Sequence, residues 1–234
     1  TNAPAPTETP EGVSEPTPFP QDPAAPVGAL SLPPDQVNIL LLGSDARPHS
    51  RNFRTDVIML ATITPSKGTI NLTSFPRDLY INIPGWGMDR INTAWAHGGF
   101  DKLAATFEYN FGVRPEHYVL VNFSSFKQIL DSLGGLEVKV DRPVSDYYRG
   151  RYVTINPGAQ HMDADLALWY VRTRKTTNDF ARTRRQQEVL MALVEKFLSL
   201  NAIRRAPEFY NIYKDNVTTD LSLTDLLPLL PMAA

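Results

Sequence analysis

The chain has 234 residues, of which 42% are hydrophobic and 21% are charged, so it can bury a core the size of one large domain. Its formal net charge is -2, with 23 basic and 25 acidic residues, and this balance argues against a general nucleic-acid binder. Any anion site must therefore come from local clustering of basic residues. The lack of cysteine excludes disulfides, thiolate zinc sites and a cysteine nucleophile.

The first 34 residues differ in composition from the rest of the chain. They contain half of the 20 prolines, with Thr, Ala, Glu and Ser between them and almost no large apolar residues. Such a segment cannot bury enough surface to fold, so we expect a disordered linker over 1–34 and one folded domain over 35–234. The linker is interpreted either as a spacer between a membrane anchor and an exported domain or as a tail without a role. No run of the chain is long and apolar enough to cross a membrane, and an anchor would lie upstream of Thr1.

Hydrophobic patterning then predicts strands and helices that alternate along the chain. The expected strands are Val37–Leu42, Val57–Ile63, Thr69–Phe75, Tyr80–Ile83, His117–Phe123 and Leu136–Val140. The expected helices are Phe100–Phe111, a helix capped by Ser124 or Ser125 that runs to Leu133, Asp163–Val171 and Asp179–Leu200. Strands interleaved with helices predict an α/β fold, in which helices flank a central mixed β-sheet.

The first three strands place charged residues at one edge of that sheet. If these strands form an antiparallel meander, the end of the first, the start of the second and the end of the third lie together. That edge would hold Asp45, Arg47, Arg54, Asp56, Arg77 and Asp78. Neighbouring carboxylates repel unless a cation lies between them, and Mg²⁺ takes one or two carboxylates together with phosphate oxygens. The alternative is that these residues are loop caps and surface ion pairs.

A second charged cluster lies late in the chain, where six basic residues and one acid fall between Arg172 and Arg185. In an extended segment Arg172 and Arg174 would point the same way. On the following helix, Asp179, Arg182 and Gln186 share a face that continues through Leu190, Leu193 and Phe197, which are expected in the core. An inward-facing arginine needs a partner, and guanidinium groups match phosphate oxygens. Arg184 and Arg185 are expected to be solvated, and an RNA-binding arginine patch is the less favoured interpretation.

Two further groups of residues carry less information. The histidines, His49, His97, His117 and His161, lack the spacing of zinc ligands. The aromatic residues Phe107, Phe111, Phe123, Phe126 and Trp169 are interpreted most simply as core, and alternatively as the lining of an apolar groove.

Several blocks of the sequence resemble, in order, those of the LytR-CpsA-Psr family. They are Asn-Ile-Leu-Leu-Leu-Gly-Ser-Asp-Ala-Arg at 38–47, Arg-Thr-Asp-Val-Ile-Met-Leu at 54–60 and Ser-Phe-Pro-Arg-Asp-Leu-Tyr at 74–80. Further blocks start at Arg90 (Arg-Ile-Asn-Thr-Ala-Trp-Ala-His-Gly-Gly), Leu133 (Leu-Gly-Gly), Tyr170 (Tyr-Val-Arg-Thr-Arg) and Asp179 (Asp-x-x-Arg-x-x-Arg-Gln-Gln). The match spans roughly Val37 to Leu200. Arg90 stands where the family often has lysine, which keeps the charge.

The resemblance implies an extracytoplasmic domain, anchored in the bacterial cell membrane by a helix that precedes the chain. It implies a phosphotransferase that moves a glycopolymer from a polyprenyl-pyrophosphate carrier to peptidoglycan through a phosphodiester, with pyrophosphatase activity as a side reaction. In the family, the aspartates matching Asp45 and Asp56 serve Mg²⁺. The residues matching Arg54, Arg77, Arg172, Arg174, Arg182 and Gln186 contact the pyrophosphate. The expected catalytic residues are Asp45, Asp56, Arg77, Asp78 and Arg174, and Asp45 and Asp78 are alternative acceptors of the hydroxyl proton.

The family's apolar groove for a prenyl chain is expected here beside the arginines, with walls from the helices around Trp95–Phe111 and Phe123–Leu133. Two alternatives to the transferase are a non-catalytic binder of prenyl-linked glycans and a regulator of transcription. Against the regulator, no helix-turn-helix is apparent and the net charge is acidic. No nucleic-acid partner is expected. Because the sequence stops soon after Pro228-Leu-Leu-Pro-Met, a C-terminal portion is expected to be missing.

Overall fold

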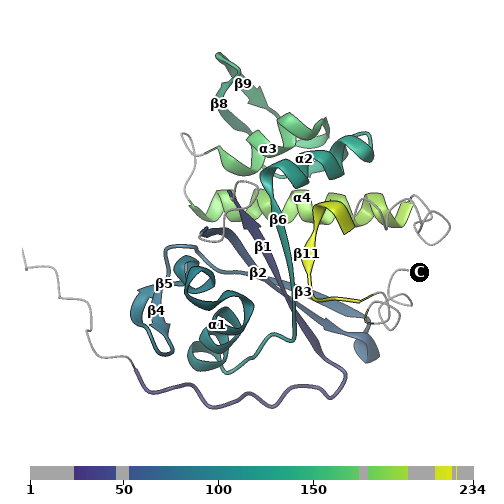
Figure 1. The fold of residues 1–234 in the computed structure, drawn as a ribbon. Coiled ribbons are helices and arrows are strands. Elements are labelled where there is room, and N and C mark those ends of the chain that lie inside the picture. The colour runs from purple at the N-terminus through teal and green to yellow at the C-terminus, as the bar shows by residue number, and fades with distance from the viewer. Residues whose placement is uncertain (1–23, 46–52, 174–178, 200–213, 223–224, 226–234) are drawn as a thin grey trace, which may run out of the picture.

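A computed structural model describes residues 24–45, 53–173, 179–199, 214–222 and 225. Its centre is a five-stranded sheet with the order β11-β6-β1-β2-β3 (Figure 1). The strands are β1 (Val37–Ser44), β2 (Thr55–Thr64), β3 (Thr69–Ser74), β6 (His117–Asn122) and β11 (Thr218–Thr219). β1 pairs in parallel with β6 and antiparallel with β2, while β3 and β11 add antiparallel edges. The predicted mixed sheet and its β1-β2-β3 meander are confirmed.

Helices cover both faces of this sheet. α1 (Ala94–Phe111) lies on one face, whereas α2 (Phe123–Ser132), α3 (Ala164–Arg172) and α4 (Asp179–Ser199) form a layer on the other (Figure 1). Alternation along β1 explains this arrangement, because successive side chains of a strand point to opposite faces. Leu40 and Leu42 pack in the cluster that holds Leu103 and Phe107 of α1, while Ile39 belongs to a separate cluster.

Three two-stranded ribbons extend the architecture. β4 (Tyr80–Ile83) pairs with β5 (Gly87–Arg90), β7 (Leu136–Val140) with β10 (Gly158–Met162), and β8 (Val144–Tyr148) with β9 (Arg151–Ile155). Short 3-10 turns, η1 (Pro65–Lys67) and η2 (Ile91–Thr93), connect β2 to β3 and β5 to α1. Sequence patterning predicts β4 and β7 but misses β5, β8, β9, β10 and β11.

Two helix starts differ from the prediction. α1 begins at Ala94 instead of Phe100, and its backbone is non-helical at Gly98 and Gly99, so the pair breaks the pattern that would reveal the first turn. The N-cap of α2 is Asn122, whose side-chain Oδ1 accepts the backbone N–H of Ser125 at 2.8 Å. The predicted caps, Ser124 and Ser125, therefore lie inside the helix.

The chain before β1 runs along the end of α1. The N–H of Val27 donates to the carbonyl of Tyr109 at 2.8 Å, and the N–H of Leu30 donates to the carbonyl of Gly112 at 3.0 Å. The Tyr109 hydroxyl donates to the carbonyl of Ala24 at 2.8 Å. These bonds hold an exposed, extended segment against the domain, whereas residues 1–23 lie outside the described ranges. In the described part of the chain, every helix falls short of the length and apolarity that a bilayer span requires.

Candidate functional site

The candidate site lies where β1 ends, β2 begins and β3 ends, as the meander predicts. Here Ser44 pairs with Thr55 and Gly43 with Val57, so Asp56 is an extra residue in β2 and forms a β-bulge. Bulges bend a strand and redirect a side chain, and they are frequent beside active sites. The bulge thus presents Asp56 at the edge of the sheet instead of in its hydrogen-bonded ladder.

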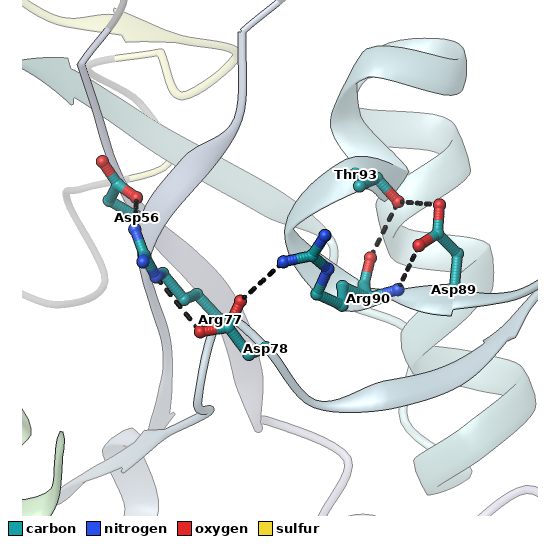
Figure 2. Close-up of polar contacts among 6 residues, drawn as sticks. All are labelled: Asp56, Arg77, Asp78, Asp89, Arg90 and Thr93. Carbon is teal, nitrogen blue, oxygen red and sulfur yellow. Dashed lines mark hydrogen bonds and ion pairs between the residues drawn. The ribbon is translucent and has the colours of Figure 1, made fainter. Parts of the chain in front are cut away.

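Asp56 is the first member of a row of ion pairs at this edge (Figure 2). Its Oδ1 accepts Nη1 of Arg77 at 2.5 Å, and Nε of Arg77 lies 3.4 Å from Oδ2 of Asp78. Oδ1 of Asp78 is in turn 3.4 Å from Nη1 of Arg90. Burial opposes the charge of Arg77, but the hydrogen bond and charge of Asp56 outweigh it, so the pKa of Arg77 is raised. Arg77 therefore stays cationic beside the carboxylates.

Helix α4 brings a further arginine to the same place. Arg182, which is only 7% exposed, lines a cavity of about 200 Å³ together with Gln186, Asp56 and Arg77. A buried guanidinium is costly unless an anion or a hydrogen-bond acceptor faces it. Arg77 and Arg182, which are far apart in sequence, thus line one cavity, while the predicted convergence of four arginines on one anion stays a prediction.

Of the remaining predicted residues, Asp45, Arg54 and Arg172 are not among the described residues that line this cavity. Asp45 follows β1 and is exposed, and Arg54, just before β2, is exposed as well. Arg172 is the last residue of α3 and its guanidinium lies 4.4 Å from the centre of the Phe123 ring. The expectation of an extended segment at Arg172 is therefore wrong, because helix α3 includes this residue. Arg47 and Arg174 lie outside the described residues.

Arg185 corrects the expectation that it would be solvated. It is 3% exposed, and it donates from Nε to the carbonyl of Tyr170 at 2.8 Å and from Nη2 to the carbonyl of Thr173 at 2.6 Å. Burial lowers the pKa of Arg185, although neighbouring groups that include Glu188 oppose the shift. Arg185 thus binds carbonyls at the C-terminal end of α3, where a cation is favourable. The sequence did carry one indication of this position, because Arg185 is spaced i, i+3 from Arg182 and the two are therefore neighbours on the helix surface.

Arg184 behaves as expected, because it is exposed and pairs with Asp141. Gln187, which sequence reasoning did not single out, donates from Nε2 to the hydroxyl of Ser74 at 2.9 Å. This bond ties α4 to the end of β3, close to Arg77. Its only signal in the sequence is that both residues fall in blocks that carry the family resemblance.

An apolar cavity of about 210 Å³ adjoins the arginine-lined one. Its walls come from β1, β2 and β6 of the sheet and from α2, α3 and α4, and none of the described residues that line it is charged. Val57 and Gln186 line both cavities, and Arg172 stacks on Phe123 at the wall. The expected groove beside the arginines, free of charge in its depth, is therefore present.

The walls of this groove are only half as predicted. Phe123 and Phe126 of α2 line it, but the helix around Trp95–Phe111 packs on the opposite face of the sheet. Leu190 and Leu193 line the cavity, and Leu193 also packs against the core that contains Val189 and Ala192. The side chain of Phe197 is outside the described residues. Phe107 and Phe111 are core residues, as expected, and pack with Phe75. Trp169 packs against the core that joins α2, α3 and α4.

A metal would find few protein ligands here. Among the described residues, no group of three or more His, Asp or Glu side chains is placed to hold an ion. Asp56 uses Oδ1 for Arg77 and presents a second carboxylate oxygen, and Asp45 emerges from the neighbouring strand. This set suits an ion that takes most of its coordination from water and phosphate, as Mg²⁺ commonly does.

The fold and this pair of adjoining cavities define an α/β domain able to hold an anionic head beside an apolar chain. Residues 17–232 match the LytR_cpsA_psr family, and the chain belongs to that family. It is 34% identical over 206 residues to the polyisoprenyl-teichoic acid–peptidoglycan teichoic acid transferase TagT of Bacillus subtilis, covering 84% of this chain and 64% of that protein.

Solved structures agree with this membership. The crystal structure of B. subtilis TagV superposes with a TM-score of 0.72 at 28% identity, covering 86% of this chain and 80% of that one. A structure of TagT bound to LI-WTA gives a TM-score of 0.67 at 30% identity, with 89% and 79% covered. The chain spans less than two thirds of the length of the curated transferase, at 64%.

The buried contacts of Arg185 lead to a prediction about stability. Arg185→Ala should destabilise the domain by about 2–4 kcal/mol, because two carbonyls at the end of α3 lose their donor in a buried place. Arg184→Ala, one position away and exposed, should change stability by less than about 0.5 kcal/mol. Urea denaturation followed by circular dichroism measures both. Equal stability of the two variants would contradict the role assigned to Arg185.

Proposed function

We propose that this chain is a phosphotransferase that moves a glycopolymer from a polyprenyl-pyrophosphate carrier to peptidoglycan and forms a phosphodiester. The observation that carries the proposal is the junction at Gln186 and Val57, which line both the arginine cavity and the apolar cavity. A prenyl pyrophosphate has the matching construction, with a charged head joined directly to a hydrocarbon chain. The curated function of TagT, transfer of teichoic acid to peptidoglycan, supports the same assignment.

In the proposed reaction a hydroxyl oxygen of the acceptor attacks the phosphorus that carries the glycopolymer. A new oxygen–phosphorus bond forms, the bond to the bridging oxygen of the pyrophosphate breaks, and polyprenyl phosphate leaves. Arg77 and Arg182 neutralise the charge that builds up on the phosphate oxygens, and the rigid frame holds the reactants in line. Attack by water in place of the acceptor would give the side pyrophosphatase activity.

The acceptor hydroxyl must also lose a proton, and two carboxylates are candidates to receive it. Asp45 is exposed at the end of β1 and can turn toward an incoming hydroxyl. Asp78 is oriented by Arg77 and Arg90, each 3.4 Å away. Both remain candidates, because each lies at the edge of the sheet that holds the phosphate-binding residues.

Mg²⁺ is the proposed cofactor, held by Asp45 and Asp56. When bound, it would offset the negative charge of the pyrophosphate. Asp56 is suited to this role because the bulge turns it toward the cavity while Arg77 fixes one of its oxygens. Arg54, Arg172 and Arg174 are proposed as further contacts to the pyrophosphate, alongside Arg77, Arg182 and Gln186.

The prenyl chain is proposed to enter the apolar cavity between the sheet and the layer of α2, α3 and α4. A protein can draw such a chain from a bilayer only if it offers a comparably apolar environment, since each buried methylene contributes about 0.8 kcal/mol. A cavity of about 210 Å³ without charged lining meets this need for the first part of the chain. The domain would work outside the cell membrane, on an anchor that precedes it.

A non-catalytic binder of prenyl-linked glycans is the alternative. The presence of both carboxylates expected for the metal, Asp45 and Asp56, favours the enzyme. The deciding experiment incubates the domain with a prenyl-pyrophosphate-linked oligosaccharide and peptidoglycan fragments, and detects the product by mass spectrometry. A phosphodiester-linked product supports the transferase, whereas binding without any product supports the alternative.

Arg182, which lines the cavity, and Arg184, which is exposed to solvent, should contribute differently to pyrophosphate binding. Arg182→Ala should weaken binding of a short-chain prenyl pyrophosphate by about 2–5 kcal/mol, because it removes a buried partner of the phosphates. Arg184→Ala removes an exposed charge that pairs with Asp141 and should change binding little. Isothermal titration calorimetry compares the two. If Arg184→Ala weakens binding as strongly, the arginine cavity is not the phosphate site.

The metal should bind together with the pyrophosphate and only weakly without it. Two carboxylates leave most of the coordination shell to water or substrate, so Asp56→Asn should abolish the gain in pyrophosphate affinity that Mg²⁺ gives to the unmodified chain. The measurement is calorimetry with and without Mg²⁺, with Asp141→Asn as a control at an exposed aspartate away from the cavity. A Mg²⁺-linked gain that persists in Asp56→Asn would refute the metal site.

A further inference from the structure

An exposed tryptophan stands at the tip of the β4–β5 ribbon. Residues 83–86 form a tight turn in which the N–H of Trp86 donates to the carbonyl of Ile83 at 2.9 Å. Pro84 occupies the second position of this turn and Gly85, with φ 74°, the third, which is the arrangement of a type II turn. Nζ of Lys102 donates to the carbonyl of Pro84 at 2.8 Å and fixes the turn to α1. Trp86 is nevertheless 61% exposed.

The indole of Trp86 is held flat by a neighbour. Its ring stacks on the imidazole of His97, with 3.6 Å between centroids and an angle of 25° between the planes. One face of the indole is therefore covered, and the other face is turned to solvent. Nε2 of His97 lies 3.9 Å from Oδ2 of Asp89, and Asp89 also accepts the hydroxyl of Thr93 at 3.0 Å. An aromatic ring with this support is a rigid, preorganised platform.

A continuous row of contacts connects this platform to the phosphate-binding edge. Asp89 accepts the backbone N–H of Arg90 at 2.7 Å, and Arg90 pairs with Asp78, which pairs with Arg77 (Figure 2). Trp86 immediately precedes β5 and lies four residues before Arg90, so a fully extended chain sets an upper limit of about 13 Å on the distance between their Cα atoms. The platform thus lies at the turn end of the ribbon, whereas Arg90 lies at its other end, beside Asp78.

The β4–β5 ribbon and the apolar cavity lie on opposite sides of the sheet. Ile81 and Ile83 of β4 pack in the cluster that contains α1, whereas the cavity opens between the sheet and α2, α3 and α4 (Figure 1). A donor that places its prenyl chain in the cavity and its pyrophosphate at Arg77 leaves the ribbon side uncovered. The attacking hydroxyl must approach from a direction that the donor does not occupy.

We propose that Trp86, supported by His97, is a subsite for a pyranose ring of the glycan acceptor. The apolar C–H face of a sugar ring packs against the electron-rich face of an indole, and the sugar hydroxyls stay in water at the rim. This inference rests on the proposed function, because it assigns the acceptor's binding surface for that reaction. A polymeric acceptor suits the separation from Arg77, since one sugar can stack on Trp86 while another offers its hydroxyl to the phosphate.

The test measures binding of soluble peptidoglycan glycan strands, freed of peptides, to the domain by calorimetry and by tryptophan fluorescence. Trp86→Ala should weaken strand binding about tenfold, and Trp86→Tyr should restore part of the loss because it keeps an aromatic face. Tyr152→Ala is the matched control, since Tyr152 is also 61% exposed but lies on the β8–β9 ribbon. Binding of a short-chain prenyl pyrophosphate should be the same in all of these variants.

The outcomes separate this inference from the function on which it rests. Loss of strand binding in Trp86→Ala alone, with unchanged pyrophosphate binding, supports the subsite. Equal strand affinity in Trp86→Ala and the unmodified chain, an equal loss in Tyr152→Ala, or no strand binding at all overturns it. If the unmodified chain binds strands but neither binds prenyl pyrophosphate nor transfers, the proposed transferase fails while the glycan subsite stands.

Discussion

The ion pair between Asp56 and Arg77 is the constraint on which the rest of the site depends. It exists because a bulge in β2 removes Asp56 from the ladder of the sheet, while β3 returns Arg77 to the same edge. The pair keeps a cation and a carboxylate side by side at a distance of 2.5 Å, so that a phosphate and a metal can each find a partner there. Helix α4 then closes the cavity by presenting Arg182, and Gln187 fixes the helix to Ser74 at the end of β3.

The spacing of residues along helix α4 separates the arginine cavity from the apolar cavity. Along α4, Arg182 and Gln186 line the arginine cavity, and Leu190 and Leu193, about one and two turns beyond Gln186, line the apolar one. The same helix therefore changes from polar to apolar without changing its face. Charge is absent from the lining of the second cavity, so a hydrocarbon chain would meet no group that must be desolvated. Arg185 donates to the carbonyls of Tyr170 and Thr173 and so fixes the backbone on both sides of Arg172 at the end of α3.

Much of the fold and of the site could be predicted from the sequence, because the long strands and α4 have strong periodicity. The alternation in β1 and β2 located the sheet edge, and the spacing from Asp179 placed Arg182 inward. The β8 and β10 strands could not be predicted, since residues such as Tyr147 and His161 do not alternate with apolar ones, whereas the alternation of Val153 and Ile155 in β9 was missed. One of the two predicted walls of the apolar cavity was wrong, because composition shows that α1 and α2 are aromatic-rich but not which face of the sheet each one covers. Nothing in the sequence pattern singled out Trp86, and only the structure shows its stack with His97.

In the proposed complex one ligand occupies both cavities, with its pyrophosphate at Arg77 and Arg182 and its chain beyond Gln186. The most direct test is the dissociation constant of prenyl pyrophosphates of increasing chain length, measured by calorimetry in detergent-free buffer and compared with inorganic pyrophosphate. The account predicts that affinity rises with each isoprene unit, with up to about 0.8 kcal/mol for every methylene that enters the protein, and then levels off when the cavity is full. The same affinity for every chain length and for inorganic pyrophosphate would contradict it.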